Sequence, residues 1–574
     1  MIAPRKLLLV TLLCFAAAGV AAASTPVQSV YVTQNGSGSQ DGTSLANAFP
    51  ISALSDSSHC GSGSTQIGPG ATVYLSAGTG GPATATFSVN SSMFNLPSAC
   101  SGANGNPVVI QMQDGDVWQA PYFAGAGAIV IDNASYVVID GGSGGTAGTG
   151  AVIQNSLNGT AGGTCPAGPC QYSQSASQGI SAHPCTGCEI RNIVVANIYV
   201  RTSLSDMSGD TSDRGVFWGG SVDIHDSTFH DADWMLVQNA SLNNTVSHIY
   251  NNNIYNMDHG IACGGKAGDT TSADFLYNNH IHDSGTWDGG SKYHHDGIHC
   301  FSGAGSNDFL QAVYIYNNLF DGQAAQSQCC LTAWVYLETG QNRWTATGTA
   351  YVWNNVAIYN PIFASGNGVL DISGGTNSVI VNNTMIQSGG PTQNGQNGVC
   401  LNASGTGLVI ENNVMQGCEQ PVLIRGDLVP SSIVRWDYNI YSDYYMNGHA
   451  GGNSPFNFVT KGGASTLSAW QTLCSCDANA VDSPNAVANL SNEGAPLSNF
   501  IGIKQGDNFM NIASGKMATL AYDTGAGDSH TPLARPGGSC SSQGNAACWE
   551  VGAYQYASGG QPPQPPTGLT AVVH

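Results

Sequence analysis

The chain has 574 residues, of which only 9% are charged, and 36 acidic against 14 basic side chains give a net charge of −22 at pH 7. Proteins that bind nucleic acid electrostatically need a basic face, so this balance excludes such a function. The same charge opposes direct attraction to an acidic polysaccharide, which would have to be held through bound cations or a locally basic groove.

The first 23 residues have the features of a secretory signal peptide. Arg5 and Lys6 precede an apolar run, Leu7–Val20, and three alanines at 21–23 form a small-residue cleavage site. No later stretch is long and apolar enough to span a bilayer. We therefore predict a signal peptide at 1–23, no membrane insertion, and a protein secreted to the extracellular space, the cell surface or a bacterial periplasm.

An Asn-Asn pair returns along the middle of the chain, each time between two short apolar strands. The first Asn of each pair stands at positions 251, 278, 317, 354, 382 and 412, at steps of 27, 39, 37, 28 and 30 residues. Self-similarity with a period of about 20 to 50 residues is typical of a solenoid. Apolar and polar residues alternate around the pairs, which predicts strands. An Asn at a fixed place in each coil of a parallel β-helix can donate to one neighbouring coil and accept from the other.

The repeat extends in both directions. Upstream, the residues at 225–226 are aligned with the pair at 251–252, and downstream those at 437–438 are aligned with the pair at 412–413. Earlier coils with less regular turns are predicted at the apolar segments Pro107–Met112 and Tyr136–Gly142. Because a solenoid grows by stacking coils, the length does not require several domains.

Two adjacent steps of the repeat are long, and their extra residues lie in Ser284–Ser306 and Gln326–Trp344. Adjacent insertions in a solenoid emerge on one side and border a groove. The first insertion holds the densest group of ionisable residues in the chain: Asp288, Lys292, His294, His295, Asp296 and His299.

Alignment of the strand DHGIAC with HDGIHC places Asp258 beside His295 and His259 beside Asp296, and one coil earlier Asp233 is assigned to the column of His259 and Asp296. Carboxylates and imidazoles about 5 Å apart shift each other's pKa and can divide acid and base roles. A purely structural stack of polar residues at the strand starts is the alternative. The predicted catalytic residues are Asp258, His259, Asp288, Lys292, His295, Asp296 and His299.

A bound cation is a further interpretation of the same columns. Asp233, Asp258 and Asp296, together with backbone carbonyls, offer the oxygen ligands that Ca²⁺ prefers. Calcium is therefore the predicted cofactor. Aromatic side chains also gather in the two insertions, where they either stack on sugar rings or pack the loops: Trp287, Tyr293, Trp334, Tyr336 and Trp344.

Of the 17 cysteines, Cys14 leaves with the signal peptide, and an even number is expected to pair in an oxidising compartment. Cys263 and Cys300 occupy matching positions of neighbouring coils, within bridging reach. Local bridges are predicted for Cys165/Cys170, Cys185/Cys188 and Cys540/Cys548. The closely spaced cysteines at 329–330 and at 474 and 476 are expected to find partners elsewhere.

Segments at the two ends of the mature chain resemble those of a known protein family. VYVTQNGSGSQDGTSLANAF (Val30–Phe49), GATVYLSAG (Gly70–Gly78) and SGANGNPVVIQ (Ser101–Gln111) resemble the opening of secreted bacterial right-handed parallel β-helix proteins of the pectate-lyase-like superfamily. WEVGAYQY (Trp549–Tyr556) resembles their last coil. The resemblance implies an all-β, right-handed parallel β-helix with an N-terminal cap, and the handedness rule for parallel crossovers agrees. We predict this domain at 24–556, followed by a Pro-rich tail at 557–574 that serves as a spacer or a docking segment.

Fold alone does not give function, because the superfamily holds lyases, hydrolases, epimerases and proteins without known chemistry. The favoured prediction is a carbohydrate-active enzyme that cleaves a polysaccharide. As a lyase, it would hold a cation on Asp233, Asp258 or Asp296 while Lys292 or a His removes a proton. As a hydrolase, it would use two of Asp258, Asp288 and Asp296 as acid and base. The alternative is a non-catalytic structural or glycan-binding rod that self-associates through its ends.

Overall fold

The structure is a computed structural model. It describes residues 28–76, 86–88, 92–123, 126–156, 177–198, 213–239, 242–265, 271–284, 295–301, 312–324, 331–337, 348–361, 369–372, 375–387, 398–424, 433–442, 444, 454–458 and 461–483, and four short strands beyond these at 488–489, 501–503, 510–511 and 549–550. The predicted signal peptide at 1–23 and the tail at 557–574 lie outside the described residues.

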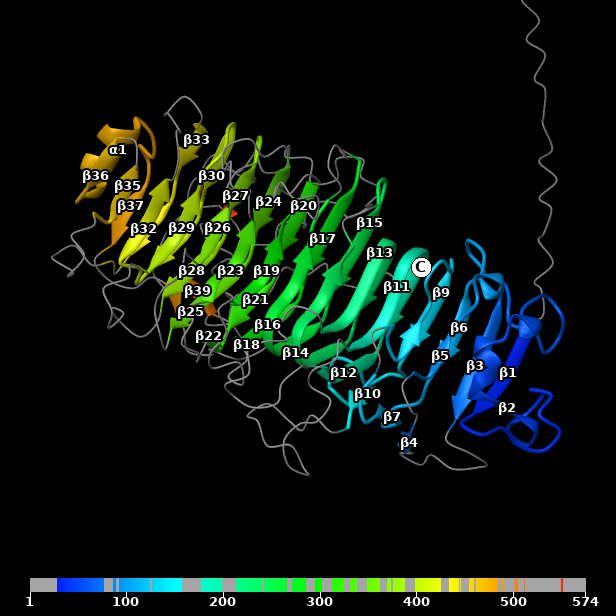
Figure 1. The fold of residues 1–574 in the computed structure, drawn as a ribbon. Helices are drawn as coiled ribbons and strands as arrows, with labels where there is room; N and C mark the ends of the chain where they lie inside the picture. Colours follow the sequence, from blue (N-terminus) through cyan, green and yellow to red (C-terminus); the bar gives the residue numbers. More distant parts are fainter. Residues whose placement is uncertain are drawn as a thin grey trace, which may run out of the picture.

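The described chain forms a right-handed parallel β-helix, as predicted. A single sheet system of 37 strands runs from β1 (Gln28–Thr33) to β37 (Val481–Ser483), with the strands side by side along one axis (Figure 1). In the body of the helix each strand pairs in parallel with the equivalent strand of the next coil, as β15 does with β17 and β17 with β20. The long sequence separation between partners is what stacked coils require.

Three stacks of parallel strands build the central coils. The first contains β13 (Arg214–His225), β15 (Val246–Tyr250), β17 (Ala273–Tyr277), β20 (Ala312–Tyr316), β24 (Thr349–Trp353), β27 (Val379–Val381), β30 (Leu408–Glu411) and β33 (Ile433–Asp437). The second contains β14 (Thr228–Gln238), β16 (Asn253–Cys263), β18 (His280–Ser284), β21 (Leu319–Asp321), β25 (Val356–Pro361), β28 (Thr384–Gln387), β31 (Val414–Gln416) and β34 (Ile440–Ser442). The third contains the ends of β14 and β16, then β19 (His295–Cys300), β23 (Leu331–Leu337), β26 (Leu370–Ile372), β29 (Val399–Ala403), β32 (Gln420–Ile424) and β35 (Phe456–Phe458).

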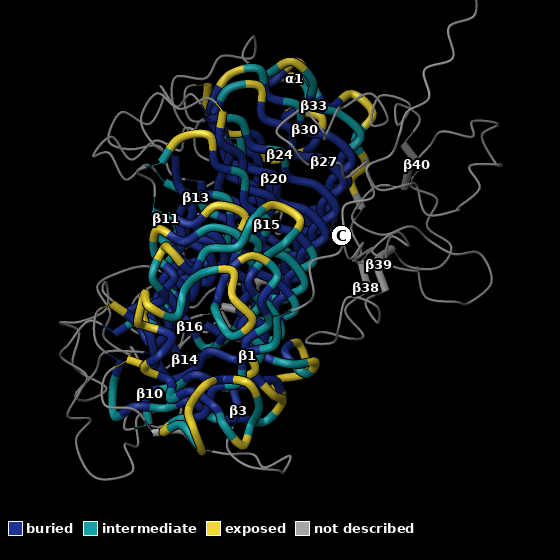
Figure 2. The backbone as a smooth tube through the Cα atoms, turned by 90° about the vertical axis from the view of Figure 1, so that its right-hand side faces the viewer, coloured by how far each residue is buried: buried dark blue, intermediate teal, exposed yellow. Residues whose placement is uncertain are grey.

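The core is a continuous apolar column inside these stacks. Inward residues such as Ile261, Ile298 and Val335 are fully buried and lie over one another in successive coils. Figure 2 shows buried backbone along the strands and exposed residues concentrated in the turns. Because side chains alternate along a strand, the residues between these core positions point to the outer face.

The second Asn of each repeated pair forms the predicted ladder. Its Nδ2 donates to Oδ1 of the next Asn at 2.9–3.1 Å, and every member is at most 2% exposed. The first Asn of each pair takes a left-handed φ of 54° to 58°, a conformation that Asn tolerates better than most residues. The ladder consists of Asn252, Asn279, Asn318, Asn355, Asn383, Asn413 and Asn439.

The predicted register is wrong by one residue at both ends of this ladder. The left-handed turn position is Asp226 upstream and Tyr438 downstream, with φ of 49° and 60°, each one residue later than predicted. The strand pairing fixes this assignment, since His225 lies beside Tyr250 and so precedes the turn. Neither turn contains the Asn-Asn pair on which the alignment depended, so no motif marks the register there.

Five disulfides lie among the described residues: Cys60–Cys100, Cys185–Cys188, Cys263–Cys300, Cys400–Cys418 and Cys474–Cys476. The predicted bridges Cys185–Cys188 and Cys263–Cys300 are confirmed. The prediction that Cys474 and Cys476 pair with distant cysteines is wrong, because they are bridged to each other. Ser475 between them adopts a left-handed φ of 54°, and their Cα atoms are 5.2 Å apart. The predicted pairs Cys165/Cys170 and Cys540/Cys548, and the cysteines at 329–330, lie outside the described residues.

Short helical elements close both ends of the large sheet. At the N-terminal end, 3-10 helices η1 (Leu45–Asn47), η2 (Ile51–Ser55) and η3 (Ser57–His59) follow β1. At the other end β36 (Gly462–Ala464) pairs antiparallel with β35, and helix α1 (Leu467–Cys474) packs its buried Trp470 against Phe456. In the described part of the chain, no helix is long and apolar enough to cross a membrane.

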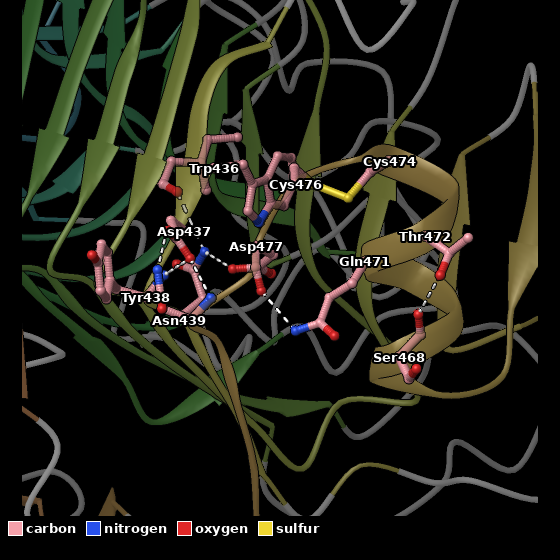
Figure 3. Close-up of a disulfide and its surroundings, with 12 residues drawn as sticks. Trp436, Asp437, Tyr438, Asn439, Ser468, Gln471, Thr472, Cys474, Cys476 and Asp477 are labelled. Atoms are coloured by element: carbon pink, nitrogen blue, oxygen red, sulfur yellow. Dashed lines mark hydrogen bonds between the residues drawn. A yellow bond between two sulfur atoms is a disulfide. The ribbon is translucent and has the colours of Figure 1, made fainter.

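The Asn ladder ends on a buried carboxylate at this C-terminal cap. Asn439 Nδ2 donates to Asp477 Oδ1 at 3.2 Å (Figure 3). The Tyr441 hydroxyl lies 2.5 Å from Asp477 Oδ2. Asp477 is 1% exposed. Burial raises the pKa of its carboxyl from 3.8 to about 7, against the lowering effect of the hydrogen bonds from Tyr441 and Asn439.

This raised pKa predicts a pH-dependent contribution to stability. Because the folded state holds the proton more tightly, the contribution is fully present below about pH 3.8 and is lost as the pH rises through about 7. The free energy of unfolding of wild type relative to Asp477→Asn should therefore fall by on the order of 4 kcal/mol between these limits. Urea unfolding at several pH values measures this difference, with Asp482→Asn as an exposed control. A pH-independent difference would contradict the assignment.

Candidate active site

The candidate site lies where β14 and β16 continue from the second stack of strands into the third, next to the start of β19. His259 pairs with Trp234 on one side and with Asp296 on the other. Gly260 and Gly297 follow these residues in neighbouring coils, and a Cβ on Gly260 would lie 2.5 Å from the Gly297 carbonyl oxygen. Glycine at these positions therefore lets neighbouring coils approach closely while the flanking polar residues are held in register.

The structure corrects the predicted place of Asp233. Trp234, and not Asp233, shares the column of His259 and Asp296. Asp233 precedes it in β14 and is fully buried. The sequence alignment placed it one residue too late because the coil containing Asp233 has no His-Gly or Asp-Gly motif to anchor the register.

Five of the predicted site residues come together: Asp258, His259, His295, Asp296 and His299. They are at most 4% exposed. His259 lies at the centre, with Nδ1 3.2 Å from Asp258 Oδ2 and Nε2 3.1 Å from His299 Nδ1 and 3.5 Å from Asp296 Oδ2. His299 Nδ1 is 3.4 Å from the same Asp296 oxygen, and His295 Nε2 is 3.5 Å from Asp258 Oδ1.

The electrostatics of this cluster favour a positive charge at its centre. Burial opposes protonation of His259, but Asp258 and Asp296 outweigh it and raise the pKa of the imidazole to about 10. The other carboxylate oxygen of Asp296, Oδ1, accepts a hydrogen bond from the backbone N–H of Ala333 at 3.0 Å. The arrangement thus places the charged imidazole of His259 between the carboxylates of Asp258 and Asp296, as expected for groups that divide acid and base roles.

Aromatic rings flank the cluster. Trp234 stacks on His259 with ring centroids 4.2 Å apart, and Tyr336 stacks on His299 at 4.9 Å. Phe301 meets the edge of Trp234 at 6.0 Å. Sequence reasoning named Tyr336 but missed Trp234 and Phe301; the position of Trp234 one coil before His259 was the available signal.

Trp334 does not belong to this aromatic surface. Its ring is fully buried in the core, and its Nε1 donates to the Ile358 carbonyl at 2.9 Å. The predicted site residues Asp288 and Lys292, and the predicted aromatic residues Trp287, Tyr293 and Trp344, lie outside the described residues.

A row of polar residues continues from the cluster along the outer face. His299 pairs with Tyr336 in β23, Tyr336 with Asp371 in β26, and Asp371 with Asn402 in β29. Asn402 Nδ2 donates to Asp371 Oδ2 at 2.8 Å. Their strand neighbours point into the core, so these side chains lie on the outer side of the sheet, although Asp371 and Asn402 are themselves fully buried.

The predicted calcium ligands do not converge on one point. Asp258 and Asp296 lie against opposite nitrogens of the His259 ring, which separates the two carboxylates. Among the described residues, two sets bring three potential ligand atoms within 4.8 Å of one another, and neither contains Asp233 or Asp258. These sets are His259/Asp296/His299 and His280/His282/Asp321. Calcium at Asp233, Asp258 and Asp296 stays a prediction that this donor arrangement does not fit.

Comparisons with known proteins leave the activity open. No family model matches the chain, and no curated protein matches it. Solved structures with a similar fold include pectate lyase Pel9A, 15% identical with a TM-score of 0.30 over 67% of this chain and 79% of that one. PfbA, a surface adhesin of Streptococcus pneumoniae, is 12% identical with a TM-score of 0.34, over 65% of this chain and 79% of that one.

A third similar structure is a tailspike protein of E. coli bacteriophage HK620 in complex with a hexasaccharide. It is 12% identical with a TM-score of 0.32, over 72% of this chain and 71% of that one. At these values the likenesses carry no argument about activity. The coil-by-coil pairing of its own strands identifies the chain as a parallel β-helix protein, of the kind that its sequence resembles.

Proposed function

We propose that the chain is a secreted, carbohydrate-active protein that cleaves a polysaccharide at the cluster of Asp258, His259, His295, Asp296 and His299. The observation that carries this proposal is the convergence of two carboxylates and three imidazoles, all at most 4% exposed, from two neighbouring coils. Burying ionisable groups is costly unless they are paired. Strongly perturbed and interacting groups of this kind concentrate at functional sites.

The geometry supplies candidates for both proton-transfer roles. In a lyase reaction, the imidazole of His295 or His299 would remove the proton next to a uronate carboxylate, and Asp258 would orient His295. In a hydrolase reaction, Asp258 and Asp296 would act as the acid and base pair on the two sides of His259. In the lyase reaction the positive charge at the centre of the cluster would stabilise the negative charge that develops on the substrate.

The row of polar residues beside the cluster follows the helix axis, which is the direction that an elongated substrate would take. His299, Tyr336, Asp371 and Asn402 come from successive coils, which are spaced by about 4.8 Å along the helix axis. Asp371 and Asn402 are fully buried, so a linear polysaccharide running along the axis from His299 would contact the partly exposed Tyr336. The disulfides among the described residues support an oxidising compartment and so a secreted protein.

The test is incubation of the purified full chain with a panel of neutral and acidic polysaccharides. Absorbance of unsaturated uronate reports a lyase, and new reducing ends without that absorbance report a hydrolase. One of the two signals is expected on at least one polysaccharide. Absence of both across the panel would contradict the proposed function.

A non-catalytic rod is the second candidate, and the continuity of the ladders favours it. In addition to the Asn ladder, stacked rings run along the first stack of strands with centroids 4.2–4.9 Å apart: Tyr250, Tyr277, Tyr316 and Trp353. If the Asp–His cluster were only one more ladder, its loss would lower the melting temperature and no turnover would exist. Self-association through the ends of such a rod stays a prediction.

A further inference from the structure

We propose that His259, Asp296 and His299 bind one divalent first-row transition ion of the Zn²⁺ class. The ligand atoms are His259 Nε2, Asp296 Oδ2 and His299 Nδ1. This inference goes beyond the proposed function, because it concerns an equilibrium binding site and holds whether or not a polysaccharide is cleaved.

The separations of the three atoms fit one ion. They are 3.1 Å between the two imidazole nitrogens, and 3.5 Å and 3.4 Å from these nitrogens to the carboxylate oxygen. Two ligands about 2.1 Å from one ion lie roughly 3.0 to 3.4 Å apart for angles between octahedral and tetrahedral values. An ion at that bond length would therefore sit roughly 0.8 Å from the plane of the three atoms.

The surroundings orient two of the three ligands. Asp258 Oδ2 lies 3.2 Å from His259 Nδ1, so an ion that displaces one proton of the charged imidazole would leave the other proton on Nδ1 and the lone pair of Nε2 facing the ion. The Ala333 N–H holds Asp296 Oδ1 and leaves Oδ2 directed at the two imidazoles. A carboxylate behind a metal-ligating imidazole and a fixed carboxylate ligand are the outer partners that transition-metal sites in proteins use.

The donor types select the class of ion. Two of the three donors are imidazole nitrogens, which suit zinc, iron and copper, whereas calcium takes six to eight oxygens. Three protein ligands also leave coordination positions open, as in catalytic rather than structural zinc sites. The site would thus present an ion with a free position next to the stacked rings of Trp234 and Tyr336.

The second set of potential ligands is less suited to an ion. His280 Nε2 lies 2.7 Å from Asp321 Oδ1, which is closer than two ligands of one ion about 2.1 Å away, and His282 has Nδ1 2.7 Å from Asp283 and Nε2 3.0 Å from Asn253. The rings of His280 and His282 stack with centroids 4.1 Å apart and do not converge edge-on. His282 therefore provides a matched control in the same protein.

The experiment is isothermal titration of the untagged, chelator-stripped full chain with Zn²⁺ and, separately, with Ca²⁺. Visible absorption of the Co²⁺-loaded protein provides a second readout of nitrogen and oxygen coordination. One Zn²⁺ per chain is expected. The affinity should fall roughly 100-fold or more in Asp296→Asn and His299→Ala, and about 10- to 100-fold in Asp258→Asn. It should not change in His282→Ala.

The proposal is overturned by absence of Zn²⁺ binding, by preference for Ca²⁺, by unchanged affinity in Asp296→Asn and His299→Ala, or by loss of binding in His282→Ala alone. Asp296→Asn preserves the shape of the side chain and its hydrogen bond from Ala333, so it keeps the test valid if His299→Ala does not fold. No substrate is present in the titration. Failure of polysaccharide cleavage and failure of the metal site are therefore separate results.

Discussion

Turnover of the polysaccharide identified in the panel assay is expected to fall by about 10²- to 10⁴-fold in Asp296→Asn and in His299→Ala, the usual range for a lost proton-transfer group. Asp296→Asn removes the negative charge but keeps the acceptor for the Ala333 N–H. His299→Ala removes an imidazole 3.1 Å from His259. Because these residues act as one cluster, the double variant should lose little more activity than either single variant.

Initial rates and melting temperatures measured on the same preparations check this prediction. His248→Gln is the matched control, since His248 also pairs with a carboxylate, Asp223, but lies in β15 outside the cluster. It should keep the wild-type rate. Wild-type turnover in Asp296→Asn, or a loss of turnover accompanied by unfolding in every cluster variant, would mean that the cluster is structural.

Asn318→Ala is expected to lower the free energy of unfolding by on the order of 4 kcal/mol. Asn318 Nδ2 donates to the Leu276 carbonyl and to Asn355 Oδ1, and its Oδ1 accepts from Asn279 Nδ2 and the Asn279 backbone N–H. Its removal leaves the Asn279 backbone N–H without its acceptor and removes four hydrogen bonds from two neighbouring coils, and a buried polar group left without a partner costs about 1 to 3 kcal/mol.

Urea unfolding followed by circular dichroism measures this effect. The matched control is Asn251→Gly, at a left-handed turn position with φ of 55°, where glycine needs no strained backbone. Its cost should stay within about 1 kcal/mol. If Asn318→Ala costs no more than Asn251→Gly, the buried ladder does not hold the coils together.

The fold was predictable because the interaction that stacks the coils requires a particular residue type at regular positions in the sequence. A buried amide ladder requires Asn at the same place in every coil, so Asn279, Asn318 and Asn355 mark the period directly. Alternating apolar residues then fix which face of each strand is buried. Cys263 and Cys300 followed from the same register, since stacked positions place their Cα atoms 4.4 Å apart.

The disulfide predictions that were wrong or missing depend on local backbone geometry, which residue identity alone does not reveal. At Ser475 a single left-handed residue turns the chain and joins Cys474 to Cys476. The bridge Cys60–Cys100 spans 40 residues of less regular structure and has no repeat to reveal it. In such segments the pairing depends on turns whose register cannot be aligned.

For the same reason, the sequence predicted which residues of the candidate site lie close together but not how their side-chain atoms are oriented. Alignment of two motifs brought together Asp258, His259, His295 and Asp296, and the structure confirms their proximity. How His259 Nε2, Asp296 Oδ2 and His299 Nδ1 face one another depends on the close approach of the two coils at Gly260 and Gly297 and on the side-chain rotamers. Donor identity alone therefore suggested calcium, whereas donor geometry favours a nitrogen-binding ion.

The most direct test of the central claim is a crystal structure of Asp296→Asn with an oligosaccharide of the polysaccharide identified in the panel assay. We predict a sugar residue within hydrogen-bond distance of His299, with the oligosaccharide running along the helix axis past Tyr336. An oligosaccharide bound on another face of the β-helix, with none of its atoms near His299, would contradict the assignment of this cluster as the active site.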